Sequence, residues 1–229
     1  MEEKLDEVRA ELSLLADCRP HEADLRALSR YKLPGKVIMA VGGLLWRAEE
    51  LARNAFEALN RQDFFTSAVL TRALMETTGG VVLIHNLVDK FIKDGVFLGF
   101  DQKINRLILG SNVWEELDDA IHVNDLLREV QKVIPGYFDE HYASLSEYAH
   151  PNWLGAFGAY GSTYEGEARI SFSQGGSAAD SQRGTILGRL SGSIGLCLGY
   201  YDLLRQMTED FVRAVEAFYA GRAEPERAI

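Results

Sequence analysis

The sequence predicts a mainly α fold: a single helical bundle with a small β-hairpin inserted near residues 156–173. Apolar residues recur every three or four positions over most of the chain, which is the period of an amphipathic helix. The composition changes after Pro151, where Gly and Tyr become frequent. Polar and apolar residues then alternate at 169–172. Because no internal repeat or biased linker interrupts residues 1–229, we expect one helical domain.

The helices follow from apolar stripes and from the Pro and Gly residues between them. Residues 1–30 are expected to form an N-terminal helical arm, in which Leu5, Val8, Leu12 and Leu15 make one stripe. The segment 63–93 is apolar on nearly every face, which predicts the central helix of the bundle. The expected helices are 4–17, 22–30, 37–60, 63–93, 101–110, 113–133, one from Gly136 to Pro151, and 181–220. The expected strands are 156–160 and 168–173, joined around Glu165-Gly166, and residues 221–229 form a frayed tail.

The composition is that of a globular protein, with 47% hydrophobic and 25% charged residues among 229. The formal net charge of -10 disfavours a nucleic-acid backbone, so DNA is not expected as a partner and RNA would need a local basic patch. Two cysteines, Cys18 and Cys197, without metal-type spacing fit a reduced, cytoplasmic protein. The acidic N-terminus does not resemble a signal peptide, and the apolar run 190–201 is too short to cross a membrane.

Glycines within the expected helices suggest close contacts between helices. Gly79 and Gly80 each weaken the central helix by roughly 1 kcal/mol relative to Ala, which is tolerable where a neighbouring helix must approach closely. In the last helix, glycines recur at three- and four-residue steps and offer a flat packing surface. Together with the heptad-like stripe of the N-terminal helix, this surface predicts a homodimer. The glycines of the last helix are Gly188, Gly192, Gly195 and Gly199.

One group of polar residues does not fit an apolar core. Arg72 and Glu76 lie four residues apart on the central helix, where an unpaired ion would be destabilising by several kcal/mol. Tyr142, Ser146 and His150 recur at four-residue steps on another helix and would supply hydrogen-bonding partners. We therefore predict that these five residues form one buried or half-buried polar cluster.

His150 is the residue of this group with the clearest chemical potential. It precedes Pro151, so it is expected to leave the helical conformation and to lie at the helix C-terminus. The carbonyl groups there favour a protonated imidazole, which can act as a general acid, and its neutral form can act as a base. The alternative is that the cluster only specifies the fold, as buried polar networks often do.

The Arg-x3-Glu pair and the motif "SEYAHP" about seventy residues later resemble uncharacterised bacterial helical proteins related to the HEPN superfamily. This resemblance implies an all-helical, dimeric fold, and many HEPN domains are metal-independent RNases of toxin and phage-defence systems. In their active motif an Arg precedes the His, with four to six residues between the two. Here Ala143, Ser144 and Leu145 occupy those positions, so only Arg72 could stabilise the developing phosphorane charge.

Two functions therefore remain open, and whether the protein is an enzyme is left undecided. The first is a HEPN-like binding or regulatory module, in stress or phage defence, with a structural polar cluster. The second is a metal-independent RNase or phosphotransfer hydrolase that uses His150 with Arg72 and Glu76. A basic groove beside His150 would favour the second function.

No metal or other cofactor is expected. The pair Glu147-x2-His150 has the spacing of a di-iron helical bundle, but Asp119-x2-His122 is its only poor second copy. The three tryptophans lie in apolar stretches, and core packing is the expected role of each. They are Trp46, Trp114 and Trp153.

Overall fold

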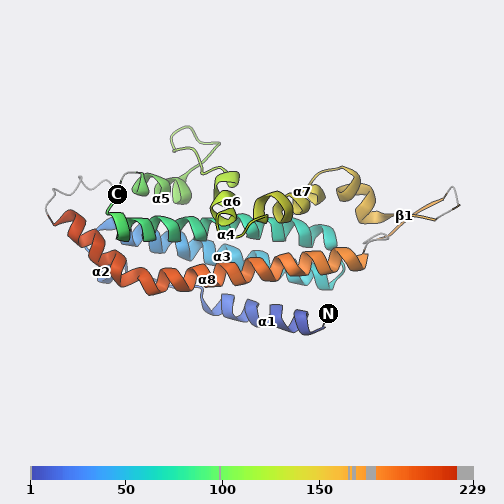
Figure 1. The fold of residues 1–229 in the computed structure, drawn as a ribbon, viewed down its shortest axis with the longest axis horizontal. Coiled ribbons are helices and arrows are strands. Elements are labelled where there is room, and N and C mark those ends of the chain that lie inside the picture. The colour runs from blue at the N-terminus through green and yellow to red at the C-terminus, as the bar shows by residue number, and fades with distance from the viewer. Residues whose placement is uncertain (1, 98, 165, 167–168, 174–178, 221–229) are drawn as a thin grey trace.

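Three long helices form the body of the structure, a computed structural model that describes residues 2–97, 99–164, 166, 169–173 and 179–220. They are α3 (Lys32–Asn60), α4 (Phe64–Asp94) and α8 (Ala179–Tyr219), and they run side by side along the long axis (Figure 1). Helix α4 packs against both of the others. Its faces are buried by α3, by α8 and by the shorter helices that follow it, which confirms the expected central helix.

The N-terminal helix lies on the bundle. Helix α1 (Glu2–Asp17) packs on α8 and α3, and it buries Val8 and Leu15 completely. The short helix α2 (Leu25–Leu28) leads into α3. The heptad-like stripe of the N-terminal helix is therefore used within its own chain and is not available to a second copy.

Local sequence chemistry explains where the central helix begins and ends. The side chain of Asp63 accepts a hydrogen bond from the Thr66 backbone N–H at 3.1 Å, as an N-cap does. Gly95 ends the helix with φ 62°, a left-handed conformation that suits glycine, and its N–H donates to the Phe91 carbonyl.

The two glycines within α4 each lie close to a different neighbouring helix. A Cβ on Gly79 would lie 2.9 Å from the main-chain carbonyl of Leu126 in α6 (Val123–Gln131). A Cβ on Gly80 would lie 3.0 Å from the Leu44 side chain of α3. Close approach is thus the reason for both glycines, but the helix that comes close at Gly79 is α6, not the helix that carries Tyr142.

Two helix starts differ from the expected positions. Helix α3 begins at Lys32, because Pro34 is tolerated in a first turn, where backbone N–H groups have no helical partner. Helix α5 (Phe100–Leu109) agrees with expectation, but the helix expected at 113–133 begins only at Val123. Residues 110–122 form a loop that is held by Arg106, whose guanidinium donates to the carbonyls of Asp119 at 2.7 Å and Ala120 at 3.2 Å.

The segment from Tyr137 to Phe172 contains two π-helical turns and the hairpin. The turn η1 (Tyr137–Tyr142) continues into α7 (Ala143–Ala149), and η2 (Trp153–Gly158) follows. Strands β1 (Gly161–Thr163) and β2 (Ile170–Phe172) pair antiparallel, with Ser162 opposite Ser171, and project beyond one end of the bundle (Figure 1).

The hairpin is thus confirmed, but a first strand at 156–160 is wrong. That position holds η2, because the Asn152 side chain accepts from the Gly155 N–H at 3.0 Å and turns the chain. Glu165 of the expected turn and the expected tail 221–229 lie outside the described residues.

The expected core role of the tryptophans is wrong for all three, since each side chain is exposed. Trp46 stands on α3, where its indole N–H donates to the Pro20 carbonyl at 2.8 Å and its ring packs under Arg19. Trp114 lies in the loop 110–122, and Trp153 packs on Phe157 of η2 at 4.5 Å between ring centroids. Partial contact of this kind suits an amphipathic indole, which needs a partner for its N–H.

Among the described residues, one helix, α4, is long and apolar enough by length and composition to cross a membrane. It is mostly buried inside the bundle: 72% of its most apolar window is covered by the protein itself. That is the environment of the core helix of a soluble protein.

Candidate functional site

Arg72, Glu76 and Tyr142 form a closed hydrogen-bonded network between α4 and the end of η1. The Tyr142 hydroxyl accepts from Arg72 Nη2 at 2.7 Å and donates to Glu76 Oε1 at 2.7 Å. Arg72 Nη2 and Glu76 Oε1 are 3.5 Å apart, so the ion pair is also direct. The predicted contact between the two helices is therefore made, and Tyr142 makes it.

This network lies at the margin of the core. The side chains of Arg72 and Glu76 are 30% and 26% exposed, while Tyr142 is buried. Burial raises the pKa of Tyr142, and its hydrogen bond to Glu76 acts in the same direction, whereas Arg72 opposes the shift. The phenol is therefore held in its protonated form, which is the form that can donate to the carboxylate.

Ser146 and His150 do not join this network. The Ser146 hydroxyl donates to the Tyr142 carbonyl of its own helix at 3.1 Å. The His150 side chain is exposed, and among the interactions of the described residues none connects it with Arg72 or Glu76. The prediction of one cluster of five residues is therefore wrong in its extent: three residues meet, and two do not.

Helix geometry explains why His150 separates from Tyr142. Each residue advances a helix by roughly 100°, so two four-residue steps leave His150 about 80° away from the direction of Tyr142. His150 also has φ -101° and ψ 144°, an extended conformation imposed by the proline that follows, as expected. The side chain is thus turned away from the face on which α7 meets α4.

His150 instead lines an open groove of about 630 Å³ at the hairpin end of the bundle. The groove is formed by α4, α7, η2 and β2, and aromatic rings dominate its wall. Among the residues that the structure describes, no lysine or arginine lines it. The aromatic members are Phe65, Tyr148, Phe157, Tyr160 and Phe172.

The groove continues into exposed aromatic surface. Phe172, on β2, is 73% exposed, and Trp153, whose ring packs on Phe157, is 70% exposed. From the sequence, the hairpin had no expected functional role, and Trp153 was expected to pack in the core. The available signal was the density of aromatic residues between 153 and 164, in a segment with too few aliphatic residues to bury them.

The arrangement has consequences for the two functions left open above. Acid–base cleavage of a phosphodiester requires a cation beside the general acid or base to stabilise the developing charge. Arg72 is engaged by Tyr142 and Glu76 and does not line the groove that contains His150. The groove suits recognition of apolar or aromatic groups better than phosphate chemistry.

Candidate metal ligands are engaged elsewhere. The Glu147 carboxylate accepts from the Asn152 side chain, and His122 uses Nδ1 to accept from the Asn124 N–H as an N-cap. Within the described part of the chain, no three His, Cys, Asp or Glu side chains are grouped so as to hold a metal ion.

Comparisons of the chain with protein families, with curated proteins and with solved structures give no match. The resemblance to HEPN proteins therefore rests on the sequence motifs around Arg72, Glu76, Ser146 and His150 alone.

Proposed function

We propose that this chain is a HEPN-like helical binding or regulatory module whose ligand surface is the aromatic groove beside His150. The observation that carries the proposal is the lining of the groove, which is rich in aromatic rings and contains no lysine or arginine. Exposed aromatic surface of this kind is typical of interaction sites. The Arg72–Glu76–Tyr142 network then has a structural role and fixes α7, and with it the groove, against α4.

In this proposal the ligand is an apolar or aromatic group of a partner protein, and His150 contributes a polar edge to its site. The two cysteines without metal-type spacing favour the cytoplasm for such a module, and the HEPN resemblance suggests stress or phage defence. The net charge of -10 is consistent with a protein partner rather than a nucleic acid.

The alternative function is that of a metal-independent RNase or phosphotransfer hydrolase that uses His150 with Arg72 and Glu76. It can be tested with the same purified protein. Purified parent protein and the His150→Ala and Arg72→Ala variants are incubated with single-stranded and hairpin RNA, and their toxicity on overexpression is compared. We expect no cleavage that depends on His150. Cleavage by the parent that disappears in His150→Ala, at unchanged melting temperature, would refute the binding-module proposal.

We also propose that the chain forms a homodimer through α8. Gly184, Gly188, Gly192 and Gly199 are exposed, and a Cβ at any of them would meet nothing within 4 Å in the described chain. Glycine destabilises a helix interior by roughly 1 kcal/mol relative to Ala, and these positions have no compensating contact among the described residues. Light scattering should report a dimer at tens of micromolar, and Gly192→Leu should shift it towards monomer; a monomeric parent would exclude this interface.

A further inference from the structure

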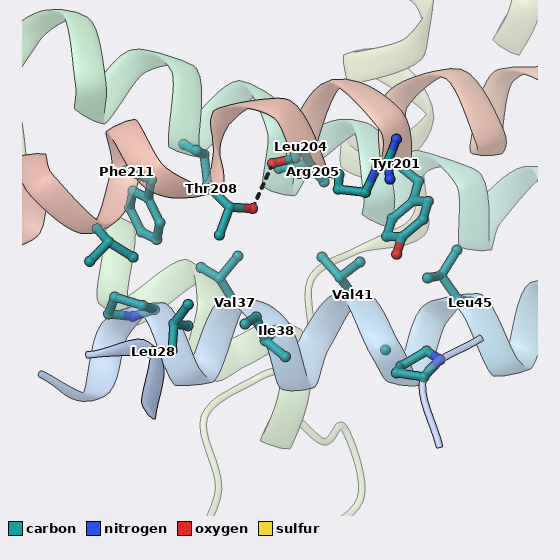
Figure 2. A pocket seen from close by; sticks show the side chains of 15 residues that line it. Leu28, Val37, Ile38, Val41, Leu45, Tyr201, Leu204, Arg205, Thr208 and Phe211 are labelled. Atoms are coloured by element: carbon teal, nitrogen blue, oxygen red, sulfur yellow. Dashed lines mark hydrogen bonds between the residues drawn. The ribbon is translucent and has the colours of Figure 1, made fainter. Parts of the chain in front are cut away.

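A second hollow lies between the N-terminal half of α3 and the C-terminal half of α8 (Figure 2). These two helix halves lie in the part of the bundle away from the hairpin (Figure 1). Its volume is about 200 Å³. Protein interiors are close-packed and contain few voids larger than a water molecule. An engineered apolar cavity of roughly 150 Å³ is already large enough to bind benzene. The cavity therefore has the size of a small-molecule site.

Its walls are apolar. Helix α3 presents Val37, Val41 and Leu45, and α8 faces them with Leu204 and Phe211 (Figure 2). Four of these five side chains are at most 7% exposed, and Val41 is 8% exposed. The body of a ligand that fills this space must accordingly be apolar.

One end of the cavity is closed by a segment that is fixed in place. Pro20 lines the cavity, and its carbonyl accepts from the Trp46 indole N–H at 2.8 Å. The neighbouring Arg19 forms an ion pair of 2.8 Å with the buried carboxylate of Glu49 and lies over the Trp46 ring. This end wall is thus held to α3 by several polar contacts, and the cavity is built into the fold.

Among the described residues that line the cavity, the polar side chains all belong to α8. The Thr208 hydroxyl is used by its own helix, since it donates to the Leu204 carbonyl at 3.1 Å. The Tyr201 hydroxyl points towards α3 (Figure 2) and makes no hydrogen bond to another of the described residues. Arg205 Nη2 donates to Asp202 at 3.0 Å, which leaves its other N–H groups for a further acceptor.

The cavity is therefore lined by two residues of adjacent turns of α8 that carry donors, a phenol O–H and a guanidinium, and the matching ligand group is an acceptor. A carboxylate fits best, because a charge-assisted hydrogen bond to a guanidinium is about twice as strong as one between neutral groups. Asp202 is the competing acceptor, but its side chain is 50% exposed, so solvent screens its repulsion of a second carboxylate.

We propose that this cavity binds a small monocarboxylate with an apolar chain of the size of octanoate, whose carboxylate contacts Arg205 and Tyr201. The proposal concerns a site that shares no lining residue with the groove beside His150. Its success or failure is therefore independent of the proposed function.

The test is calorimetric titration of the full chain with octanoate and, separately, with octan-1-ol, which has the same chain length and no charge. We expect saturable binding of one octanoate per chain. Arg205→Gln should weaken octanoate binding by about tenfold, the order of one charge-assisted hydrogen bond at a partly solvated site, and should leave octan-1-ol binding unchanged. Val41→Trp, which fills the cavity, should abolish binding of both.

Arg213→Gln is the matched control. Arg213 also lies on α8, pairs with an aspartate three residues before it, and has the same 70% side-chain exposure as Arg205, but it does not line the cavity. The proposal is overturned if the parent shows no saturable octanoate binding, or if Arg205→Gln and Arg213→Gln weaken it equally. Because Arg205 is exposed, its variant should remain folded even if Val41→Trp does not, and thermal melts of each variant check this.

Discussion

Two arginine–glutamate networks of this molecule are built on the same four-residue helical spacing but differ in their burial. On α3, Glu49 is 7% exposed and pairs with Arg19 at 2.8 Å and with Arg53 at 3.0 Å. On α4, Glu76 is 26% exposed and shares Arg72 with the Tyr142 hydroxyl. The glutamate on the less apolar helix is thus the more deeply buried of the two.

The difference shows that burial of a charge depends on what packs over it, and not on the composition of its own helix. Glu49 is covered because Arg19 and Pro20 fold back on α3 and are anchored there by Trp46. Glu76 lies on the nearly all-apolar α4, where the Tyr142 hydroxyl contacts it but leaves the side chain 26% exposed. The two networks should therefore contribute differently to stability.

The largest effect is expected for Glu49→Gln. Removing one partner of a fully buried ion pair is destabilising by roughly 3–5 kcal/mol, and we expect about 2 kcal/mol here because solvent still screens Arg19 and Arg53. Urea unfolding at neutral pH measures the change. The control is Glu50→Gln, an exposed neighbour on the same helix, which should change the free energy of unfolding by less than about 0.5 kcal/mol. Equal effects of the two variants would contradict the contrast drawn above.

A smaller effect is expected for Tyr142→Phe. The variant removes one donor and one acceptor from the network, but Arg72 and Glu76 still face each other at 3.5 Å. We therefore expect a loss of about 1 kcal/mol, the usual net contribution of a hydrogen bond. Tyr160→Phe is a suitable control, since Tyr160 is exposed and takes no part in the network.

Comparison of the parent protein with Tyr142→Phe should also show a pH dependence of stability. The pKa of Tyr142 in the folded protein is raised above its ordinary value of 10.0, mainly by burial and then by Glu76. A raised pKa means that the phenol contributes stability below the unfolded-state value, and that this stability is lost as the pH rises through the folded-state value. The difference in unfolding free energy between parent and Tyr142→Phe should hold at pH about 8 and shrink above pH about 10. A difference that grows with pH would show that Tyr142 is not protonated in the network.

The smallest effect is expected for His150→Ala. The side chain is exposed and belongs to neither network, so the free energy of unfolding should change by less than about 0.5 kcal/mol. His141→Ala, an exposed histidine in the same helical segment, is the matched control. A loss of several kcal/mol in His150→Ala alone would mean that His150 belongs to the Arg72–Glu76–Tyr142 network after all.

Local sequence chemistry was sufficient for most of the helices and for the existence of the hairpin. The period of apolar residues, the Asp63 cap and the Pro after His150 act over a few residues, so their effects can be predicted without knowing what packs where. The loop at 110–122 could not be predicted in this way, because it depends on the Arg106 side chain, which binds carbonyl groups more than ten residues away. The turn η2 does have a local cap, since the Asn152 side chain accepts from the Gly155 N–H, but the Gly- and Tyr-rich sequence that follows also fits a strand.

The same distinction between local chemistry and tertiary packing applies to the candidate site. By itself, the sequence determined that Arg72 and Glu76 need a polar partner, because an ion on an apolar helix is destabilising unless it is paired, and it identified Tyr142 among the candidates. Only the tertiary structure decided that His150 turns away from them into an aromatic groove, that Glu49 is the more buried acid, and that α3 and α8 leave a cavity between them. These outcomes depend on rotation along a helix and on residues far apart in the chain that are brought together, such as Arg19 with Glu49, or Val41 and Leu204 on the walls of one cavity. No local pattern specifies such contacts, because each is fixed by the packing of whole helices.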